Sequence, residues 1–180
     1  MAIQQILLAQ GGAVADNWVT AAQWTKEAGS GASWGGFTFR VVVPASALVA
    51  GSKIRLTCQS SDTSGCTIAA MYVGAAAASG DDYDFATTPT PVLFSGSASA
   101  AIGAASSLVS DPTTFTVDAS KPLIISTYMS VAGRTANITT LAGWVTRYKS
   151  GNDAATVNAT GYSTSAYAAN FVTKIEVLVP

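Results

Sequence analysis

The residues best placed to do chemistry are three aspartates around one tyrosine, Asp81, Asp82 and Asp84, in the phrase GDDYDF. Two carboxylates held a defined distance apart can catalyse glycoside hydrolysis. These three lie too close together in sequence to form such a pair by themselves. The other acidic residues that could complete a pair are Asp111, Asp118, Glu27 and Glu176. Because Asp111 and Asp118 both stand in turn sequences, the pattern argues against a hydrolase.

The same acidic phrase has two other interpretations. Closely spaced aspartates supply the hard oxygen ligands that Ca²⁺ prefers, although the phrase lacks the full EF-hand pattern and its glutamate. Alternatively, the carboxylates accept hydrogen bonds from nearby backbone N–H groups and fix a turn, while Tyr83 and Phe85 pack inward. We take the turn as the first interpretation and keep a structural Ca²⁺ as the second.

The chain contains no histidine and two cysteines, Cys58 and Cys66. The absence of histidine excludes Ser-His-Asp and Cys-His mechanisms and every His-ligated metal site. Two cysteines alone are too few ligands for zinc. The sequence therefore predicts neither an enzyme nor a bound cofactor.

Cys58 and Cys66 each share the parity of the apolar residues around them. Two strands joined by the intervening Ser, Asp and Gly loop would bring the thiols opposite each other. A disulfide closing this loop would contribute roughly 2–3 kcal/mol. The alternative is a pair of reduced, half-buried thiols, as is usual in a cytosolic protein. Both remain open at this point.

Aromatic residues are the third candidate site. Flat aromatic faces stack on the apolar side of a sugar ring, and a neutral Ser, Thr and Asn surface supplies hydrogen bonds. The alternative is that these residues are anchors of the core or of a subunit interface. The set comprises Trp18, Trp24, Trp34 and Trp144, together with Tyr148 and Tyr162.

Composition limits the partners. Charged residues make up 11% of the 180 residues, and nine Lys and Arg oppose ten Asp and Glu. There is no basic face for a nucleic acid. A surface with so little charge repels its neighbours weakly, which suits a protein covered by copies of itself or by other subunits. No apolar stretch approaches the ~20 residues of a membrane span.

Period-two alternation dominates the chain and predicts β-strands. In GFTFRVVVP, Phe37, Phe39, Val41 and Val43 share one face, and Thr38 and Arg40 share the other. Similar runs, separated by Gly, Pro, Asp, Asn and Ser clusters, occur at 52–58, 66–73, 91–94, 114–118, 122–130, 143–149 and 172–179. They predict an all-β protein, a single antiparallel β-sandwich of jelly-roll type over residues 13–180. Helical spacing occurs only near residues 17–29.

Residues 1–12 are predicted to form an attachment arm. The apolar residues Ile3, Ile6, Leu7 and Leu8 are followed by the hinge-like pair Gly11-Gly12. The stretch lacks the basic region and the long apolar region of a secretory signal, so we expect synthesis in the cytoplasm. A short apolar arm of this kind would bury itself against a partner subunit.

Three phrases carry a family resemblance: MYVGAAAASGDDYDFATTPTPVLFSGSASA, VSDPTTFTVDASKPLIISTYMS and GWVTRYKSGNDAATVN. They resemble a β-rich module of phage and prophage virion proteins, which is also similar to non-catalytic regions attached to tail-associated hydrolases. The opening MAIQQILLAQGG resembles the start of phage tail-fibre and other virion proteins. The resemblance runs from about Arg40 to the end. The cysteine pair departs from it.

The resemblance implies a structural protein at the virion surface: a capsid decoration, a head-spike component or a tail-fibre module. It implies no activity, and no catalytic residue is carried over. Together with the low charge, it predicts a homo-oligomer, a trimer, that contacts other virion proteins and contributes to host attachment. The alternative is a carbohydrate-binding module that recognises host surface polysaccharide.

Overall fold

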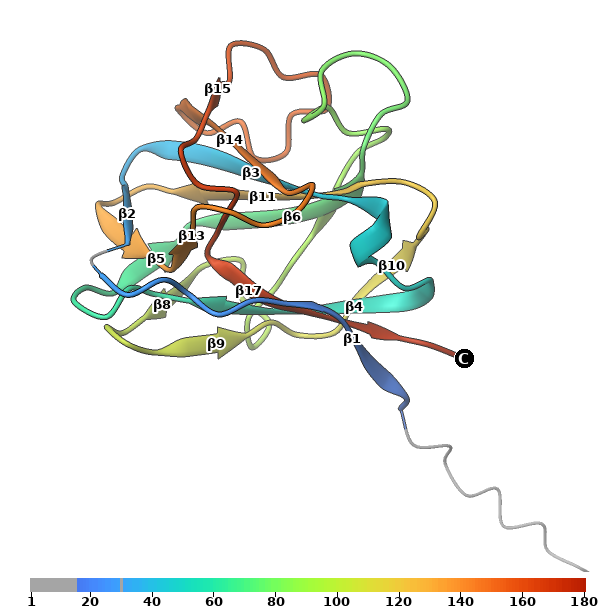
Figure 1. The fold of residues 1–180 in the computed structure, drawn as a ribbon, viewed down its shortest axis with the longest axis horizontal. Coiled ribbons are helices and arrows are strands. Elements are labelled where there is room, and N and C mark those ends of the chain that lie inside the picture. The colour runs from blue at the N-terminus through green and yellow to red at the C-terminus, as the bar shows by residue number, and fades with distance from the viewer. Residues whose placement is uncertain (1–15, 30) are drawn as a thin grey trace, which may run out of the picture.

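Two antiparallel β-sheets face each other in the computed structural model, which describes residues 16–29 and 31–180 (Figure 1). The five-stranded sheet comprises β1 (Trp18–Gln23), β17 (Val172–Leu178), β4 (Gly51–Gln59) and β10 (Thr113–Val117), with β9 (Ser107–Val109) also paired to β4. The six-stranded sheet runs in the order β15 (Ser163–Thr164), β14 (Val145–Ser150), β3 (Phe37–Val43), β11 (Leu123–Met129), β6 (Ala70–Ala75), β7 (Thr90–Pro91).

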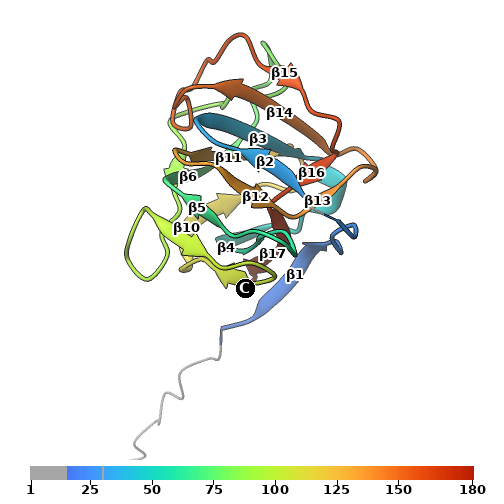
Figure 2. The same cartoon turned by 90° about the vertical axis from the view of Figure 1, so that its left-hand side faces the viewer.

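Short strand pairs cover one end of the sandwich, the end that faces the viewer in Figure 2. These pairs are β2 (Ala32–Trp34) with β12 (Gly133–Thr135), β13 (Asn137–Ile138) with β16 (Ala169–Asn170), and β5 (Cys66–Ile68) with β8 (Ala100–Ile102). One turn of 3₁₀-helix, η1 (Ala45–Ala47), follows β3. No helix in residues 16–29 and 31–180 is long and apolar enough to cross a membrane.

The main core lies between the two sheets and is formed by the apolar faces of the strands, as the alternation of apolar and polar residues predicted. In β4, Ile54, Leu56 and Cys58 are fully buried and alternate with partly exposed residues. In β3, Phe39 and Val41 point into the same core. The antiparallel β-sandwich that the sequence predicted is therefore confirmed, whereas the jelly-roll order is not confirmed.

The outer face of the six-stranded sheet is buried as well, contrary to the alternation pattern. Thr38 and Arg40, which share the strand face opposite to Phe39 and Val41, are both 0% exposed. Residues 76–90 and 151–162 cover this face, and a second apolar cluster lies beneath them, formed by Val42, Ala76, Tyr83, Phe85, Ile124 and Ala159. A continuous apolar run such as Val41 to Val43 is typical of a strand covered on both faces.

Two expectations for individual elements were wrong. The helical spacing near residues 17–29 gives no helix, because Trp18 to Gln23 form the edge strand β1, paired in antiparallel register with β17. The β-branched Val19 and Thr20 favour that conformation. In place of the strand expected at 91–94, the structure has the two-residue strand Thr90–Pro91 at the edge of the six-stranded sheet, a position where proline is tolerated. The attachment arm, 1–12, with Ile3, Ile6, Leu7 and Leu8, lies outside the described residues.

Candidate functional site: an aromatic hollow at one end of the sandwich

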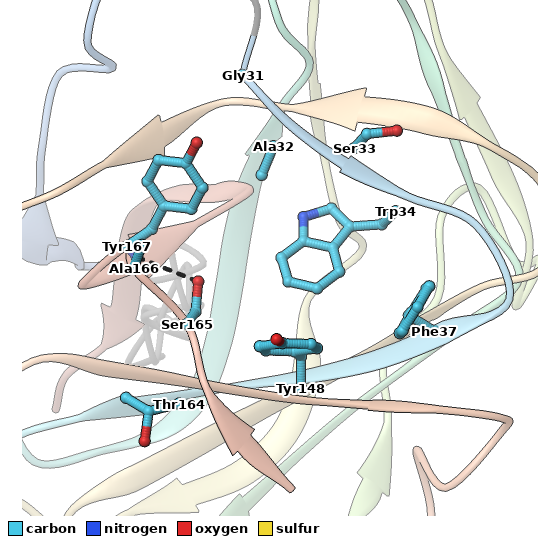
Figure 3. A pocket seen from close by; sticks show the side chains of 10 residues that line it. All are labelled: Gly31, Ala32, Ser33, Trp34, Phe37, Tyr148, Thr164, Ser165, Ala166 and Tyr167. Atoms are coloured by element: carbon cyan, nitrogen blue, oxygen red, sulfur yellow. Dashed lines mark hydrogen bonds between the residues drawn. The ribbon is translucent and has the colours of Figure 1, made fainter.

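An open hollow of about 500 Å³ lies where β2 meets β14 and β15 (Figure 3). Its volume is within the ~300–1,000 Å³ usual for ligand pockets. Four of its lining residues are aromatic: Trp34, Phe37, Tyr148 and Tyr167. The remainder are small or carry hydroxyls: Gly31, Ala32, Ser33, Thr164, Ser165 and Ala166. None of these ten residues is charged.

The short strand β2 fixes the floor of the hollow. Ala32 and Trp34 point inward and are buried, whereas Ser33 between them is exposed. Trp34 donates a hydrogen bond from Nε1 to Thr135 Oγ1 at 3.1 Å, which holds the indole in one orientation. Gly36, with a φ of 72° that favours glycine, then turns the chain into β3. The turn places Phe37 at the rim.

The aromatic rings pack edge to face around Trp34. The indole and the Tyr148 ring have centroids 5.5 Å apart and an interplanar angle of 63°. The Phe37 ring lies at 6.2 Å and 71°, and Phe39 lies beneath the indole at 5.0 Å. Such geometries are the favoured ones for aromatic pairs. Trp34 is only 6% exposed, so the half-exposed Tyr148 and Tyr167 offer most of the aromatic surface.

The segment that carries Tyr167 is held by backbone hydrogen bonds. Ser165 N donates to Thr146 O at 2.8 Å, and Tyr167 N donates to Ser165 Oγ at 3.1 Å, the bond drawn in Figure 3. Thr164 Oγ1 accepts a hydrogen bond from Arg147. In the described part of the chain, no protein group hydrogen-bonds to the hydroxyl of Tyr148 or Tyr167. The hollow therefore combines fixed aromatic walls with hydroxyls available to a ligand.

Only two members of the predicted aromatic platform, Trp34 and Tyr148, are brought together. Trp24 and Trp144 are buried in the main core. Trp18 belongs to the five-stranded sheet, where the Arg55 guanidinium lies 4.6 Å from its ring centroid. Tyr162 lies beside Tyr83 under the outer loops, with ring centroids 4.8 Å apart. The single six-residue platform is thus wrong, because these side chains extend from different sheets and faces.

Sequence reasoning missed Phe37 and Tyr167 as members of the hollow. Phe37 shares the parity of the core residues Phe39 and Val41, so alternation placed it in the core. Tyr167 lies between β15 and β16, outside any strand, where no periodicity predicts the direction of a side chain. The one local signal for a turn at Tyr167 was the serine two residues before it, Ser165, since a serine side chain often accepts a hydrogen bond from the backbone N–H two residues on.

The acidic phrase forms a turn closed by Asp84. This side chain is 7% exposed. Its Oδ2 accepts a hydrogen bond from Asp81 N at 3.1 Å, and its Oδ1 accepts one from Ala159 N at 3.0 Å. The first bond fixes the local turn, and the second ties residues 76–90 to residues 151–162. Asp84 therefore links the two segments of the outer layer.

The neighbouring aspartates face different partners. Asp82 Oδ2 accepts a hydrogen bond from Arg147 Nη2 at 2.5 Å. Burial and a hydrogen bond with Asp81 raise the pKa of the Tyr83 hydroxyl. In residues 16–29 and 31–180, no three Asp, Glu, Cys or His side chains gather as a metal ion would require. The three carboxylates proposed as Ca²⁺ ligands, Asp81, Asp82 and Asp84, serve contacts within the protein.

The other carboxylates considered for catalysis also have hydrogen-bond partners within the protein. Asp111 accepts hydrogen bonds from Ser95 N and Gly96 N, and Asp118 accepts them from the backbone and hydroxyl of Ser120. The Asp118 contacts fix its own turn, as its sequence setting predicted, whereas Asp111 binds a turn 15 to 16 residues earlier in the chain, which the sequence did not predict. Glu27 accepts two hydrogen bonds from Thr139, which lower the pKa of its carboxyl group.

The fourth carboxylate, Glu176, lies on the outer face of the five-stranded sheet. Burial would raise its pKa, but hydrogen bonds from Arg55 and Lys174 outweigh burial and lower it. The Arg55 Nε to Glu176 Oε2 distance is 3.0 Å, and the Lys174 Nζ to Glu176 Oε1 distance is 2.9 Å. Glu176 is therefore an ion-pair partner and lies on the sheet opposite to the acidic phrase.

Cys58 and Cys66 are both free and buried. Each lies on an inward-facing position of its strand, as their parity predicted. The two strands do not form a hairpin, however: β4 pairs with β17, β10 and β9, and β5 pairs with β8. Burial raises the pKa of Cys66 to about 12. Burial, and to a smaller extent the electrostatic effect of Cys66, raises the pKa of Cys58. The thiols are protonated at neutral pH.

Neither a scan against protein-family models nor a search of curated proteins finds a match to this chain.

Proposed function

We propose that this chain is a structural surface protein of a phage or phage-like particle. In this proposal, the segment that precedes β1 attaches the sandwich to the particle, and the opposite end of the sandwich faces outward. The observation that carries the proposal is the position of the aromatic hollow at the end of the sandwich remote from residues 16 and 180. The sequence resemblance to virion modules supports the same assignment.

The separation of the two ends follows from the register of β4. Its first residue, Gly51, lies against Leu178, and Leu178 pairs with Trp18, so both ends of the described chain leave the sandwich there. After its last residue, Ser60 bridges to Thr135, which pairs with Ala32 in the hollow. The nine residues of β4 span about 30 Å at ~3.3 Å per residue. A domain held through β1 would present the hollow away from its attachment.

The weakly charged surface supports assembly into an oligomer, which we propose to be a trimer in contact with other virion proteins. Charged residues make up 11% of the chain, and little charge repulsion opposes contact between copies. The described residues also expose four large apolar side chains, Val49, Leu93, Val109 and Val131.

Deleting residues 1–12 tests the attachment proposal. We expect the truncated chain to keep its unfolding temperature, and to be lost from particles assembled with it. A matched control is Trp18→Ala, which changes β1 and leaves residues 1–12 intact. Normal incorporation of the truncated chain would contradict the proposal, and so would unfolding of the truncated chain, because the arm would then belong to the core.

The aromatic hollow favours a second function, recognition of host surface polysaccharide. Fixed aromatic walls and hydroxyls without protein partners are what a sugar ring needs from a protein. This function is compatible with the first, since a sandwich attached at one end exposes the hollow at the other. Retention of the purified chain on immobilised polysaccharide tests it separately from incorporation into particles.

A further inference from the structure

We propose that the hollow binds an uncharged sugar ring of a polysaccharide, held against the rings of Tyr148 and Tyr167. This inference rests on the second proposed function and specifies its ligand and its residues. Three features of the hollow carry it: the arrangement of the aromatic rings, the absence of charge and the state of the hydroxyls.

The aromatic rings that line the hollow are held in position by contacts within the protein. Trp34 is fixed by its hydrogen bond to Thr135 and by the Phe39 ring beneath it. Tyr148 extends from β14 and packs its edge against the indole. Figure 3 shows Tyr148 and Tyr167 on two sides of the Trp34 ring. A preformed apolar surface of this kind binds a rigid ring at a low cost in conformational entropy.

The lining selects against a charged ligand. Among the residues that the structure describes, no lysine, arginine, aspartate or glutamate lines the hollow. The two guanidinium groups nearby are already engaged: Arg134 donates to Gly31 O at 3.2 Å, and Arg147 contacts Thr164 and Asp82. An acidic sugar would lose hydration at its carboxylate and gain no cation in return. An uncharged sugar does not carry this cost.

The hydroxyl groups that line the hollow can hydrogen-bond to a sugar. Thr164 Oγ1 and Ser165 Oγ each accept one bond from the protein, so each hydroxyl can still donate its hydrogen. The hydroxyls of Tyr148 and Tyr167 can donate and accept. Apolar walls with a few oriented polar groups are the usual lining of a ligand pocket.

The test uses the full chain and two sets of soluble polysaccharides. The neutral probes are dextran, mannan, galactan and chitin oligomers, and the acidic probes are alginate and polygalacturonate. Tryptophan fluorescence reports binding, because Trp34 forms the floor of the hollow. We expect saturable binding of at least one neutral probe and none of the acidic probes.

Two substitutions assign the binding to the hollow. Tyr167→Ala removes an aromatic wall and should weaken binding about tenfold. Tyr167→Phe keeps the ring and should weaken it about threefold, the effect of one hydrogen bond. Tyr72→Ala is the matched control, since Tyr72 is a half-buried tyrosine of β6 outside the hollow. It should leave the affinity unchanged.

Four other outcomes would each contradict the inference for a different reason. If no polysaccharide binds, the carbohydrate function itself fails. If binding is unaffected by Tyr167→Ala, the function stands but its site lies elsewhere. If only acidic probes bind, the ligand class is wrong. If Tyr167→Ala instead converts an oligomer to a monomer in light scattering, the hollow is a contact between copies.

Discussion

The guanidinium of Arg40 lies over the ring of Phe85, with Arg40 Cζ 4.6 Å from the ring centroid. Arg40 is fully buried at the centre of β3. Its Nη1 donates to Tyr83 O at 2.5 Å, and its Nη2 donates to the carbonyls of Asp153 and Thr156. One side chain therefore anchors both covering segments, 76–90 and 151–162, to the sheet. Burial lowers the pKa of the guanidinium, although arginine remains protonated at neutral pH.

Replacing Arg40 should be the most damaging single change in the outer layer. Arg40→Met keeps much of the volume and removes a side-chain donor from three carbonyl oxygens, of which Tyr83 O is buried. We expect the free energy of unfolding in urea to fall by about 2–4 kcal/mol. The control Arg55→Met removes a partly exposed ion pair with Glu176, which should cost less than about 1 kcal/mol. Equal losses would show that Arg40 is not the anchor.

Gly74 should not tolerate a side chain. A Cβ at this position of β6 would lie 2.5 Å from Phe85 Cδ1, so Phe85 would have to move away from Arg40. We expect Gly74→Ala to lower the free energy of unfolding by about 1–3 kcal/mol. In Gly103→Ala the new Cβ would have its nearest neighbour at 3.5 Å, and stability should change little. Thermal melts of the two variants settle the comparison.

The three aspartates of the acidic phrase should differ in their effect on stability. Asp84→Asn leaves one carboxamide oxygen where two carboxylate oxygens each accept a backbone N–H, and should cost about 1–2 kcal/mol. Asp82→Asn loses a partly exposed ion pair with Arg147 and should cost less than about 1 kcal/mol. Asp81→Asn should cost least.

Thermal melting curves of the unmodified chain and of the aspartate variants also test whether the acidic phrase binds calcium. If the acidic phrase is a turn, EDTA and added Ca²⁺ should leave the melting temperature of the unmodified chain unchanged. A drop on chelation that is absent from a triple Asn variant of Asp81, Asp82 and Asp84 would instead assign these residues to a metal site.

Alkaline pH should weaken the fold through the buried thiols. The pKa of Cys66 rises from 9.0 to about 12 in the folded chain, so the unfolded chain loses this proton at a lower pH. The contribution to stability is complete below about pH 9 and is lost as the pH rises toward about 12. In Cys66→Ala, the free energy of unfolding should fall less steeply across this range. Identical slopes in urea titrations of both proteins would contradict the assignment.

The amino-acid sequence by itself determined the long strands β3, β4, β11, β14 and β17, because alternation depends on neighbouring residues. Alternation in β4 predicted which side chains are buried, and Ile54, Leu56 and Cys58 are each 0% exposed. The turn chemistry of Asp118 also followed from the sequence, since an aspartate often bonds the backbone N–H two residues on in the chain. Burial of one strand face and local hydrogen bonding need no knowledge of the rest of the fold.

Tertiary structure alone decided what covers the second face of the six-stranded sheet and which aromatic residues meet. Arg40 has the spacing of a solvent-facing residue, yet residues more than forty positions away in the chain bury it. Trp34 and Tyr148 form one hollow, with Tyr167 at its wall, while Trp18, Trp24 and Trp144 lie elsewhere. Periodicity reports the direction of a side chain relative to its own strand. Contact between distant segments depends on how the sheets and loops pack, which no local pattern encodes.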